Sequence, residues 1–225
     1  MHNDPSNENG ILHSWQQNAE AWTNTVRDGL IESRRLVTDR AIVDAVLDGQ
    51  PRSVLDLGCG EGWLVRALAT RGIQAVGVDA VPALIARASE RGGEFQVASY
   101  EDIAAGRLPL RVDALVCNFA LLGKESAERL VASLPSLLSE DGRFVVQTVH
   151  PLVACGEQAY VDGWRQEGWT GFGTAFPSPA PWYFRTLASW VGLFAETGWH
   201  LCEMREPLHP ETGRPASVIF ILQRH

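Results

Sequence analysis

The sequence predicts an α/β fold: a three-layer sandwich in which helices cover both faces of a mostly parallel, seven-stranded sheet. Short apolar runs of strand length alternate with segments whose apolar residues recur at helical spacing. The first such run, residues 54–57, leads into glycines at alternate positions (Gly58, Gly60 and Gly62), and a helical pattern follows directly. Strand, glycine turn and helix in that order are typical of a ligand site at the carboxyl end of a strand.

Composition and charge are those of one globular core and argue against several functions. Hydrophobic residues make up 45% of the chain and charged residues 20%, and the formal net charge is −8. Such a chain is a poor candidate for a broad nucleic-acid surface, because phosphate neutralisation needs clustered Lys and Arg. Residues 1–10 show no secretory signal, no apolar run has the length of a membrane span, and the four cysteines form no C-x-x-C pair. We therefore expect a cytoplasmic protein with reduced thiols.

The part of the chain before the sheet, residues 1–50, is expected to form a tail and two helices. Residues 1–10 are polar and predict a disordered tail. Apolar residues around Trp15 follow helical spacing, and a second helix is predicted over residues 31–47. Residues 51–225 are expected to form the main domain.

That domain is predicted to alternate helices and strands to its end. Pro135 lies within one helical pattern and is expected to kink or shorten that helix, and Glu140 to Gly142 are expected to turn into the next strand. The predicted helices cover 61–70, 82–91, 126–138 and 187–195, and the strands after the first cover 75–78, 95–98, 112–117, 143–149, 199–205 and 216–222.

The residues of the glycine turn carry a resemblance to a known family. Residues 54–62, with the pattern D-x-G-x-G-x-G from Asp56, and the acid Asp79 at the end of the next strand resemble the first motif of class I S-adenosylmethionine (SAM)-dependent methyltransferases. The resemblance implies a Rossmann-like fold with an antiparallel last strand and an N-terminal helical lid. It implies SAM as cofactor and S-adenosylhomocysteine (SAH) as product. The nicotinamide pattern G-x-G-x-x-G is not met, because Trp63 stands in place of its third glycine.

Cofactor contacts implied by the resemblance lie along one edge of the predicted sheet. Asp79 would accept hydrogen bonds from the ribose hydroxyls. Arg34 or Arg35 would bind the SAM carboxylate, with Arg34 preferred, since an Arg fork matches a carboxylate. The whole predicted set is Arg34, Asp56, Gly58, Gly60, Asp79, Ala80, Ser99, Tyr100, Asn118 and Phe119.

Within that set, the residues after the third and fourth strands have alternatives. Ser99 and Tyr100 would meet the adenine, although the first position could shift to Glu101 or Asp102. Ser99 with Asp102 three residues later is also a helix N-cap pattern. Asn118 and Phe119 would line the methionine part of SAM.

A long aromatic insertion at residues 150–182 breaks the alternation and predicts a lid or acceptor pocket, or else a cover over the sheet edge. His150 follows the fifth strand and is the candidate general base, with a hydrogen-bonded structural histidine as the alternative. The candidate acceptor-binding residues are Trp15, Tyr160, Trp164, Tyr183 and Arg185. No His, Cys and Asp cluster has metal-ligand spacing, so no metal is expected.

The function predicted is methyl transfer from SAM to a small molecule, with oxygen of an aromatic or quinone-like compound as the preferred acceptor. Residues 182–187 and 205–207 resemble bacterial ubiquinone- and menaquinone-biosynthesis methyltransferases. A tRNA or protein methyltransferase, an NAD-dependent oxidoreductase and a non-catalytic SAM-binding protein are the alternatives. The sequence leaves open whether the protein is a monomer or a homodimer.

Overall fold

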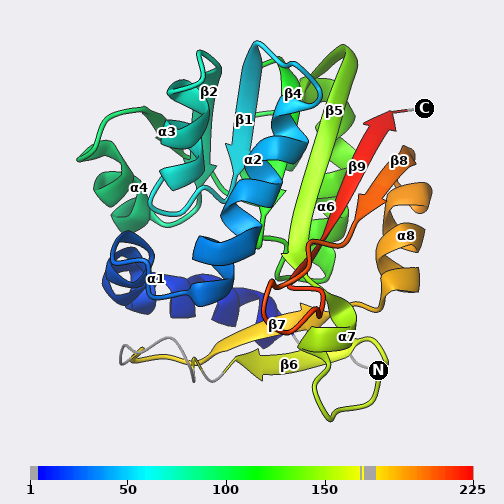
Figure 1. Cartoon of the computed structure of the whole chain (residues 1–225). Coiled ribbons are helices and arrows are strands. Elements are labelled where there is room, and N and C mark those ends of the chain that lie inside the picture. Colours follow the sequence, from blue (N-terminus) through cyan, green and yellow to red (C-terminus); the bar gives the residue numbers. More distant parts are fainter. Residues whose placement is uncertain (1–4, 168, 170–175, 225) are drawn as a thin grey trace.

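A computed structural model of the chain describes residues 5–167, 169 and 176–224. At its centre is a seven-stranded sheet with the strand order β3-β2-β1-β4-β5-β9-β8 (Figure 1). The strands are β1 (Ser53–Leu57), β2 (Gln74–Asp79), β3 (Glu94–Val97), β4 (Val112–Asn118), β5 (Leu138–Val149), β8 (Trp199–Arg205) and β9 (Ser217–Arg224).

Strand β1 lies at the point where the order of the strands reverses. It pairs in parallel with β2 on one side and β4 on the other, so that Leu55 is opposite both Val76 and Leu115. A crevice outside the carboxyl ends of the strands is expected at such a switch point. Strand β9 runs antiparallel to both β5 and β8, which confirms the predicted seven-stranded sheet with an antiparallel last strand.

Helices cover both faces of this sheet and bury alternate strand residues. On one face α2 and α3 pack against Val54 and Val116, and on the other α6 and α8 pack against Leu55 and Leu115. The helical elements are α1 (Pro5–Arg27), the π-helix η1 (Arg34–Thr38), α2 (Asp39–Leu47), α3 (Trp63–Ala69), α4 (Pro82–Ser89), α5 (Tyr100–Ala104), α6 (Glu125–Ser133), the 3-10 helix η2 (Leu134–Leu137), α7 (Pro151–Ala154) and α8 (Leu187–Glu196). No helix in the described part of the chain combines the length and apolarity that crossing a membrane requires.

Several predicted boundaries shift. Helix α1 begins at Pro5, so the expectation of a disordered tail over residues 1–10 is wrong for residues 5–10, while residues 1–4 lie outside the described part. Helix α6 ends at Ser133 and η2 contains Pro135, which confirms the predicted shortening. Strand β5 begins at Leu138, and a register shift in its pairing with β4 replaces the turn expected at residues 140–142.

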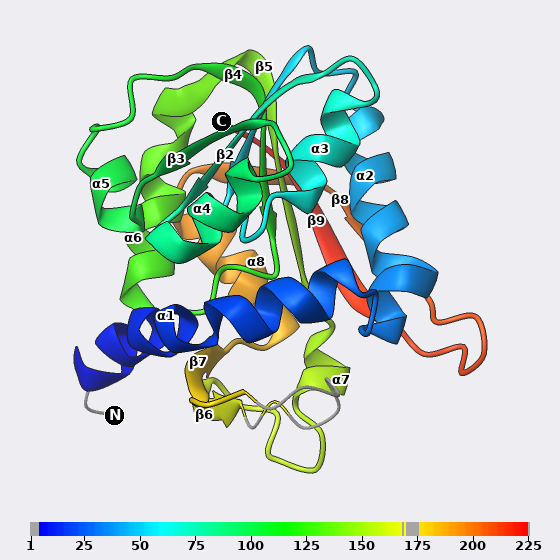
Figure 2. The ribbon, with the colours of Figure 1, turned by 90° about the vertical axis from the view of Figure 1, so that its left-hand side faces the viewer.

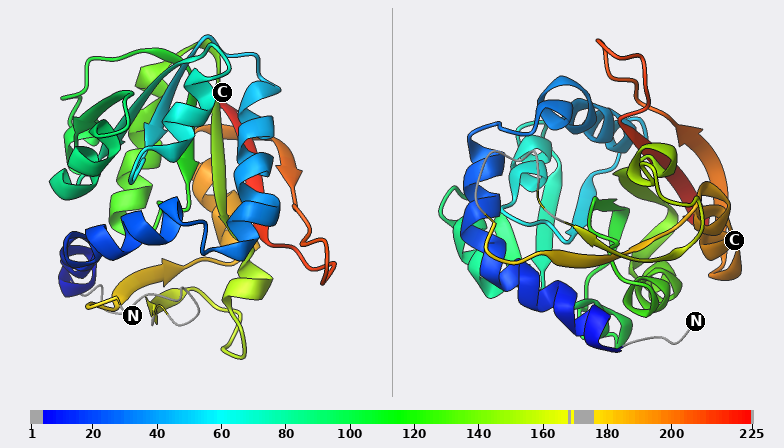
Figure 3. Two further views of the ribbon diagram at one scale, coloured as in Figure 1. Left: turned by 60° about the vertical axis from the view of Figure 1, so that its left-hand side comes forward. Right: turned by 90° about the horizontal axis from the view of Figure 1, so that it is seen from below.

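The insertion forms a second, small sheet at the carboxyl end of the main one. Strands β6 (Gly163–Glu167) and β7 (Ala180–Phe184) are antiparallel, with Trp164 opposite Tyr183. Helix α1 runs between this pair and the end of the main sheet (Figure 1), and the turned view in Figure 2 shows the same order. Seen from below in Figure 3, β7 crosses the carboxyl ends of the strands and α1 runs along one side of them.

Candidate functional site

The turn after β1 depends on backbone conformations that favour glycine. Gly58, Gly60 and Gly62 have φ values of 75°, 56° and 83°. A Cβ on Gly58 would lie 2.5 Å from the Cβ of Ala120, so the turn packs closely against the loop after β4. The N–H groups of Gly58 and Cys59 donate to the carbonyl oxygen of Val78 at 2.8 and 3.0 Å. The turn is thus tied to the end of β2.

The carboxylate of Asp79 completes that connection. Its Oδ2 accepts a hydrogen bond from the Gly60 N–H and its Oδ1 from the Val81 N–H, both at 2.9 Å. Burial raises the pKa of Asp79, and these backbone donors act in the opposite direction. Each carboxylate oxygen has a further lone pair, so the group can also accept hydrogen bonds from a diol. Ala80, which is also predicted to contact the cofactor, lies in the chain between Asp79 and Val81.

Arg34 is buried beside the turn, whereas Arg35 is exposed, so the structure separates the two candidates. Nε of Arg34 donates to Oδ1 of Asp39 at 2.9 Å. The guanidinium carbon lies 4.8 Å from the ring centroid of Trp63 and 6.0 Å from that of Trp22. Its Nη2 is buried with no hydrogen-bond partner among the described residues.

Two further buried side-chain atoms have no partner in the described part of the chain, Oγ1 of Thr38 and Oδ1 of Asp56, and only the second belongs to an ionisable group. Burial and the nearby Asp79 raise the pKa of Asp56 to about 8, against the opposing effect of Arg34. A cationic amine near Asp56 and a carboxylate near Arg34 would satisfy both atoms. The amino-acid end of SAM has these two groups, so the residues fit this cofactor.

Ser99 and Tyr100 begin α5 at the end of β3. Ser99 and Asp102 form a capping box: the Ser99 Oγ accepts from the Asp102 N–H at 3.1 Å, and Asp102 Oδ2 accepts from the Ser99 N–H at 3.0 Å. The N-cap interpretation is confirmed, and the adenine contact stays a prediction. The Tyr100 hydroxyl donates to the carbonyl of Ala120 at 3.1 Å and would lie equally close to a Cβ on Gly58.

Asn118 ends β4 and Phe119 begins the next loop, beside a buried amide that the sequence analysis missed. Gln147 on β5 donates from Nε2 to Asn118 Oδ1 at 2.7 Å and to the carbonyl of Thr38 at 3.1 Å. Its backbone carbonyl accepts the N–H of Phe119, which has a φ of 56° that is uncommon for a residue with a side chain. The available signal was a lone amide within the apolar strand pattern at residues 144–149.

An aromatic cluster of Trp15, Trp22, Trp169 and Phe176 joins α1 to the insertion. The ring centroids of Trp15 lie 5.1 Å from Trp22 and 5.3 Å from Trp169, both edge to face. Trp169 stacks on Phe176 at 4.6 Å. Nε1 of Trp22 would lie 3.4 Å from a Cβ on Gly60, so this cluster reaches the glycine turn.

Beside the aromatic cluster, two hydrogen bonds between Asn18 and Ser178 connect α1 to the insertion. The buried Asn18 donates from Nδ2 to the carbonyl of Ser178 at 2.6 Å and accepts the N–H of Ser178 at 3.2 Å. Trp15, a predicted acceptor-binding residue, therefore lies one helical turn before the residue that binds the insertion, Asn18.

Two other predicted acceptor-binding residues, Trp164 and Tyr183, lie on the second sheet, and Arg185 directly follows its strand β7. Trp164 and Tyr183 lie edge to face at 5.5 Å. Arg185 is buried, and its guanidinium donates to the carbonyls of Gly123 and Lys124 at 2.9 Å each. Burial lowers the pKa of this Arg185 side chain.

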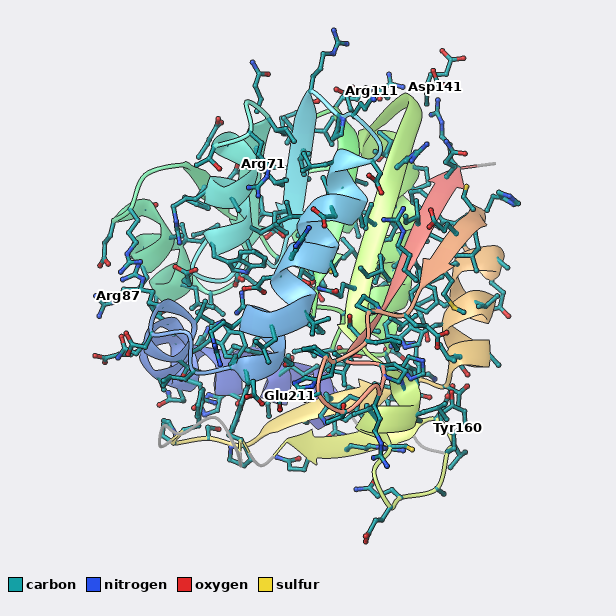
Figure 4. The ribbon with its side chains drawn as sticks, viewed as in Figure 1. Arg71, Arg87, Arg111, Asp141, Tyr160 and Glu211 are labelled. Carbon is teal, nitrogen blue, oxygen red and sulfur yellow. The ribbon has the colours of Figure 1, made fainter. Side chains whose placement is uncertain are left out.

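Tyr160 is set apart from these residues. Its hydroxyl accepts the N–H of Leu187 at 2.9 Å, and Figure 4 shows it at the outer margin of the molecule. The structure does not bring Tyr160 to the cluster at the glycine turn.

His150 is buried at the start of α7, and both ring nitrogens have partners. Nδ1 accepts the N–H of Leu152 at 3.2 Å, and Nε2 lies 2.7 Å from Oε1 of Glu206. An Nδ1 that accepts leaves the proton on Nε2, directed at the Glu206 carboxylate. A general-base role at Nε2 therefore requires the other tautomer, with the proton on Nδ1 and the hydrogen bond from Leu152 lost, and requires Glu206 to move aside; that role stays a prediction.

A surface groove of about 390 Å³ lies at the other end of the sheet, among residues including Arg52, Asp113 and Asp141. Figure 4 shows Asp141 at the end of the molecule opposite α1. Oδ2 of Asp113 already accepts the N–H groups of Arg52 and Ser53, and no residue lining this groove is among the described residues with a buried, unpaired side-chain atom. Within the described ranges, no cluster of His, Cys, Asp or Glu could hold a metal ion.

Comparison with known proteins identifies relatives of the chain. A family model described as "Methyltransferase domain" matches residues 32–203. A ubiquinone biosynthesis O-methyltransferase of Xylella fastidiosa (strain M23) is 34% identical over 107 residues, which cover 45% of this chain and 43% of the relative. The match thus spans less than half the length of that curated relative.

Solved structures share the fold at low sequence identity. The DhpI–SAM–HEP complex has a TM-score of 0.68 at 16% identity and covers 99% of this chain and 100% of its own. An S-adenosylmethionine-dependent methyltransferase from Mesorhizobium loti has a TM-score of 0.60 at 21% identity, with 80% of this chain and 96% of its own covered.

Proposed function

The chain belongs to the methyltransferase-domain family, and we propose that it transfers a methyl group from SAM to an oxygen atom of a small aromatic or quinone-like acceptor. The observation that carries the proposal is the pair of buried, unsatisfied atoms Arg34 Nη2 and Asp56 Oδ1 beside the glycine turn. Buried polar groups without partners are costly, and a zwitterionic amino-acid group would satisfy both. SAM ends in such a group.

The remaining cofactor contacts follow from the same edge of the sheet. Asp79 would accept the ribose hydroxyls with the lone pairs that its bonds to Gly60 and Val81 leave free. Gly58 and Gly60 would let the ligand approach the backbone without a Cβ in the way. Tyr100 and the loop after β4 would close the side of the cofactor site opposite Asp79.

When bound, SAM supplies a methyl group made electrophilic by its sulfonium. The protein's task is then mainly placement of the acceptor, with exclusion of water from the site. Trp15 and Trp22 on α1 and Trp169 on the insertion would do both, because their edge-to-face rings form apolar walls that reach the glycine turn. In this proposal residues 1–50 are the lid and flank of the domain formed by residues 51–225.

Two observations support an aromatic acceptor and an oxygen nucleophile. Flat rings pack well against edge-to-face Trp side chains. The Xylella relative is a ubiquinone biosynthesis O-methyltransferase, although its match covers only 45% of this chain. His150 is the proposed base: in the tautomer with its proton on Nδ1, and with Glu206 moved away, the Nε2 lone pair would take the hydroxyl proton.

A two-step assay tests the proposal. Calorimetry first compares SAM, SAH and NAD, with binding of the first two expected and no binding of NAD. Release of SAH is then followed with phenols, quinols, amines and bulk tRNA as acceptors. Turnover with phenols or quinols is the expected result, and turnover confined to amines or tRNA would overturn the choice of acceptor.

A further inference from the structure

The loop between β4 and α6 is held by three separate elements through its carbonyl groups. The Leu122 carbonyl accepts the N–H of Tyr183 at 2.7 Å. Arg185 donates to the next two carbonyls, of Gly123 and Lys124, and the Tyr100 hydroxyl donates to that of Ala120. Strand β7, the segment before α8 and helix α5 thus all act on the loop that begins at Phe119.

A fourth element, the start of α1, holds the same loop through its donors. Oε1 of Glu8 accepts the N–H groups of Lys124 and Glu125 at 2.8 and 2.9 Å, and Oε2 accepts the hydroxyl of Ser126 at 2.7 Å. These are the free N–H groups at the beginning of α6, where a negative charge is favourable. A Cβ on Gly123 would collide with the Glu8 carboxylate, so the close approach depends on that glycine.

The other end of α1 is attached to the glycine turn. Nε of Arg27 lies 3.4 Å from Oε2 of Glu61, a buried residue of the turn that is also paired with Arg66 at 2.6 Å. Between the two ends, Trp22 covers Gly60. Helix α1 therefore spans the switch point between β1 and β4, with one end on each side.

We propose that Glu8 is a positioning residue for the cofactor site: its carboxylate couples the placement of α1 over the glycine turn to the conformation of the loop that carries Phe119. The proposal rests on the proposed function for its ligand, SAM, but the coupling itself is a property of the protein alone. A residue that only capped α6 would stabilise that helix and leave α1 unaffected. A coupling residue changes both together.

Hydrogen exchange on the ligand-free protein tests the coupling directly. In Glu8→Ala, the amides of Lys124 and Glu125 and the amides of α1 are expected to lose protection together, by about tenfold. Glu8→Gln keeps an acceptor oxygen and should recover much of the protection. Glu20→Ala is the matched control, because Glu20 is an exposed acid on the same helix, and it should behave as wild type.

Calorimetry with SAM gives the second readout. Glu8→Ala should raise the Kd for SAM about tenfold, and Ser126→Ala should raise it less. The double variant should be weaker than wild type by less than the product of the two single effects, since both remove one contact. In turnover assays, KM for SAM should rise more than kcat falls.

The outcomes separate this inference from the proposed function. If Lys124 and Glu125 lose protection while α1 and the Kd for SAM stay at wild-type values, Glu8 is only a helix cap and the inference is wrong. If wild type does not bind SAM, the proposed function fails, and the exchange result still decides whether Glu8 couples the two elements.

Discussion

Arg34 and Asp56 each bury a polar atom without a partner among the described residues, and they do so within electrostatic reach of one another at the glycine turn. The two groups do not satisfy each other: Nε of Arg34 bonds to Asp39 instead. A site that keeps a guanidinium N–H and a carboxylate oxygen available is suited to a ligand that carries both a carboxylate and an amine.

The first prediction concerns the fork of Arg34. Arg34→Lys keeps the charge but loses the planar donors, and the Kd for SAM should rise by a factor of roughly 10 to 100, the equivalent of about 1.5–3 kcal/mol for one charge-assisted hydrogen bond. Arg35→Lys is the matched control, because Arg35 is exposed. Titration calorimetry on both variants decides, and equal effects at the two positions would contradict the assignment.

Asp79 is predicted to hold the ribose. Asp79→Asn should weaken SAM binding by about 1.5 kcal/mol or more, because a neutral amide accepts hydrogen bonds less strongly and one of its two arms is a donor. Asp113→Asn controls for the loss of backbone contacts, since Asp113 also accepts two N–H groups, at the opposite end of the sheet. The control should lower the melting temperature without changing the affinity for SAM. Unchanged affinity in Asp79→Asn would remove the ribose role.

The titration of Asp56 gives a pH dependence with a definite sign. Burial and the neighbouring Asp79 raise its pKa from 3.8 to about 8, so the ligand-free fold keeps a proton that the unfolded chain releases. Asp56 therefore contributes most to stability below pH 4, and this contribution is lost as the pH rises to 8. Asp56→Asn does not titrate, so its melting temperature relative to wild type should increase from pH 4 to pH 8. A constant difference across this range would contradict the prediction.

The affinity for SAM should also depend on the titration of Asp56, but it should increase with pH where the stability contribution decreases. A cationic amine beside Asp56 lowers the pKa of the carboxyl, so binding releases a proton and the affinity of wild type should increase from pH 6 to pH 8. In Asp56→Asn this slope should flatten. Calorimetry in buffers of different ionisation enthalpy measures the proton released, and an identical proton count in both proteins would exclude Asp56 as its source.

His150 is predicted to act on turnover alone. His150→Ala should lower kcat at least about 100-fold if its imidazole removes the acceptor proton, and should leave the Kd for SAM unchanged. Glu206→Gln is the informative partner, since it keeps a side chain of the same size opposite Nε2. If His150→Ala loses thermal stability but turns over like wild type, the residue is structural.

The main sheet could be predicted because its signals are local. The apolar runs that became β1, β2 and β4 and the glycines after β1 are each contained within a few consecutive residues. Pro135 marked the end of α6 for the same reason: a proline without an N–H cannot continue the helix.

What the sequence could not predict depends on contacts between distant segments. The helical start of α1 is held by the contact of its Glu8 with the N–H of Lys124 at the start of α6, 116 residues away in the chain. The meeting of Trp22 with Gly60, the role of Gln147 between Thr38 and Asn118, and the pairing of β6 with β7 are likewise set by packing. Spacing in the sequence did not distinguish Arg34 from Arg35 as the residue for the SAM carboxylate, and only the burial of Arg34 in the structure separates them.

The most direct test of the whole account is a crystal structure of the protein with SAH bound. The account predicts the ribose hydroxyls within hydrogen-bond distance of Asp79, the carboxylate of the ligand on Arg34 and its amine beside Asp56. Adenosine density elsewhere, with Asp79 still bonded only to the N–H groups of Gly60 and Val81, would contradict it.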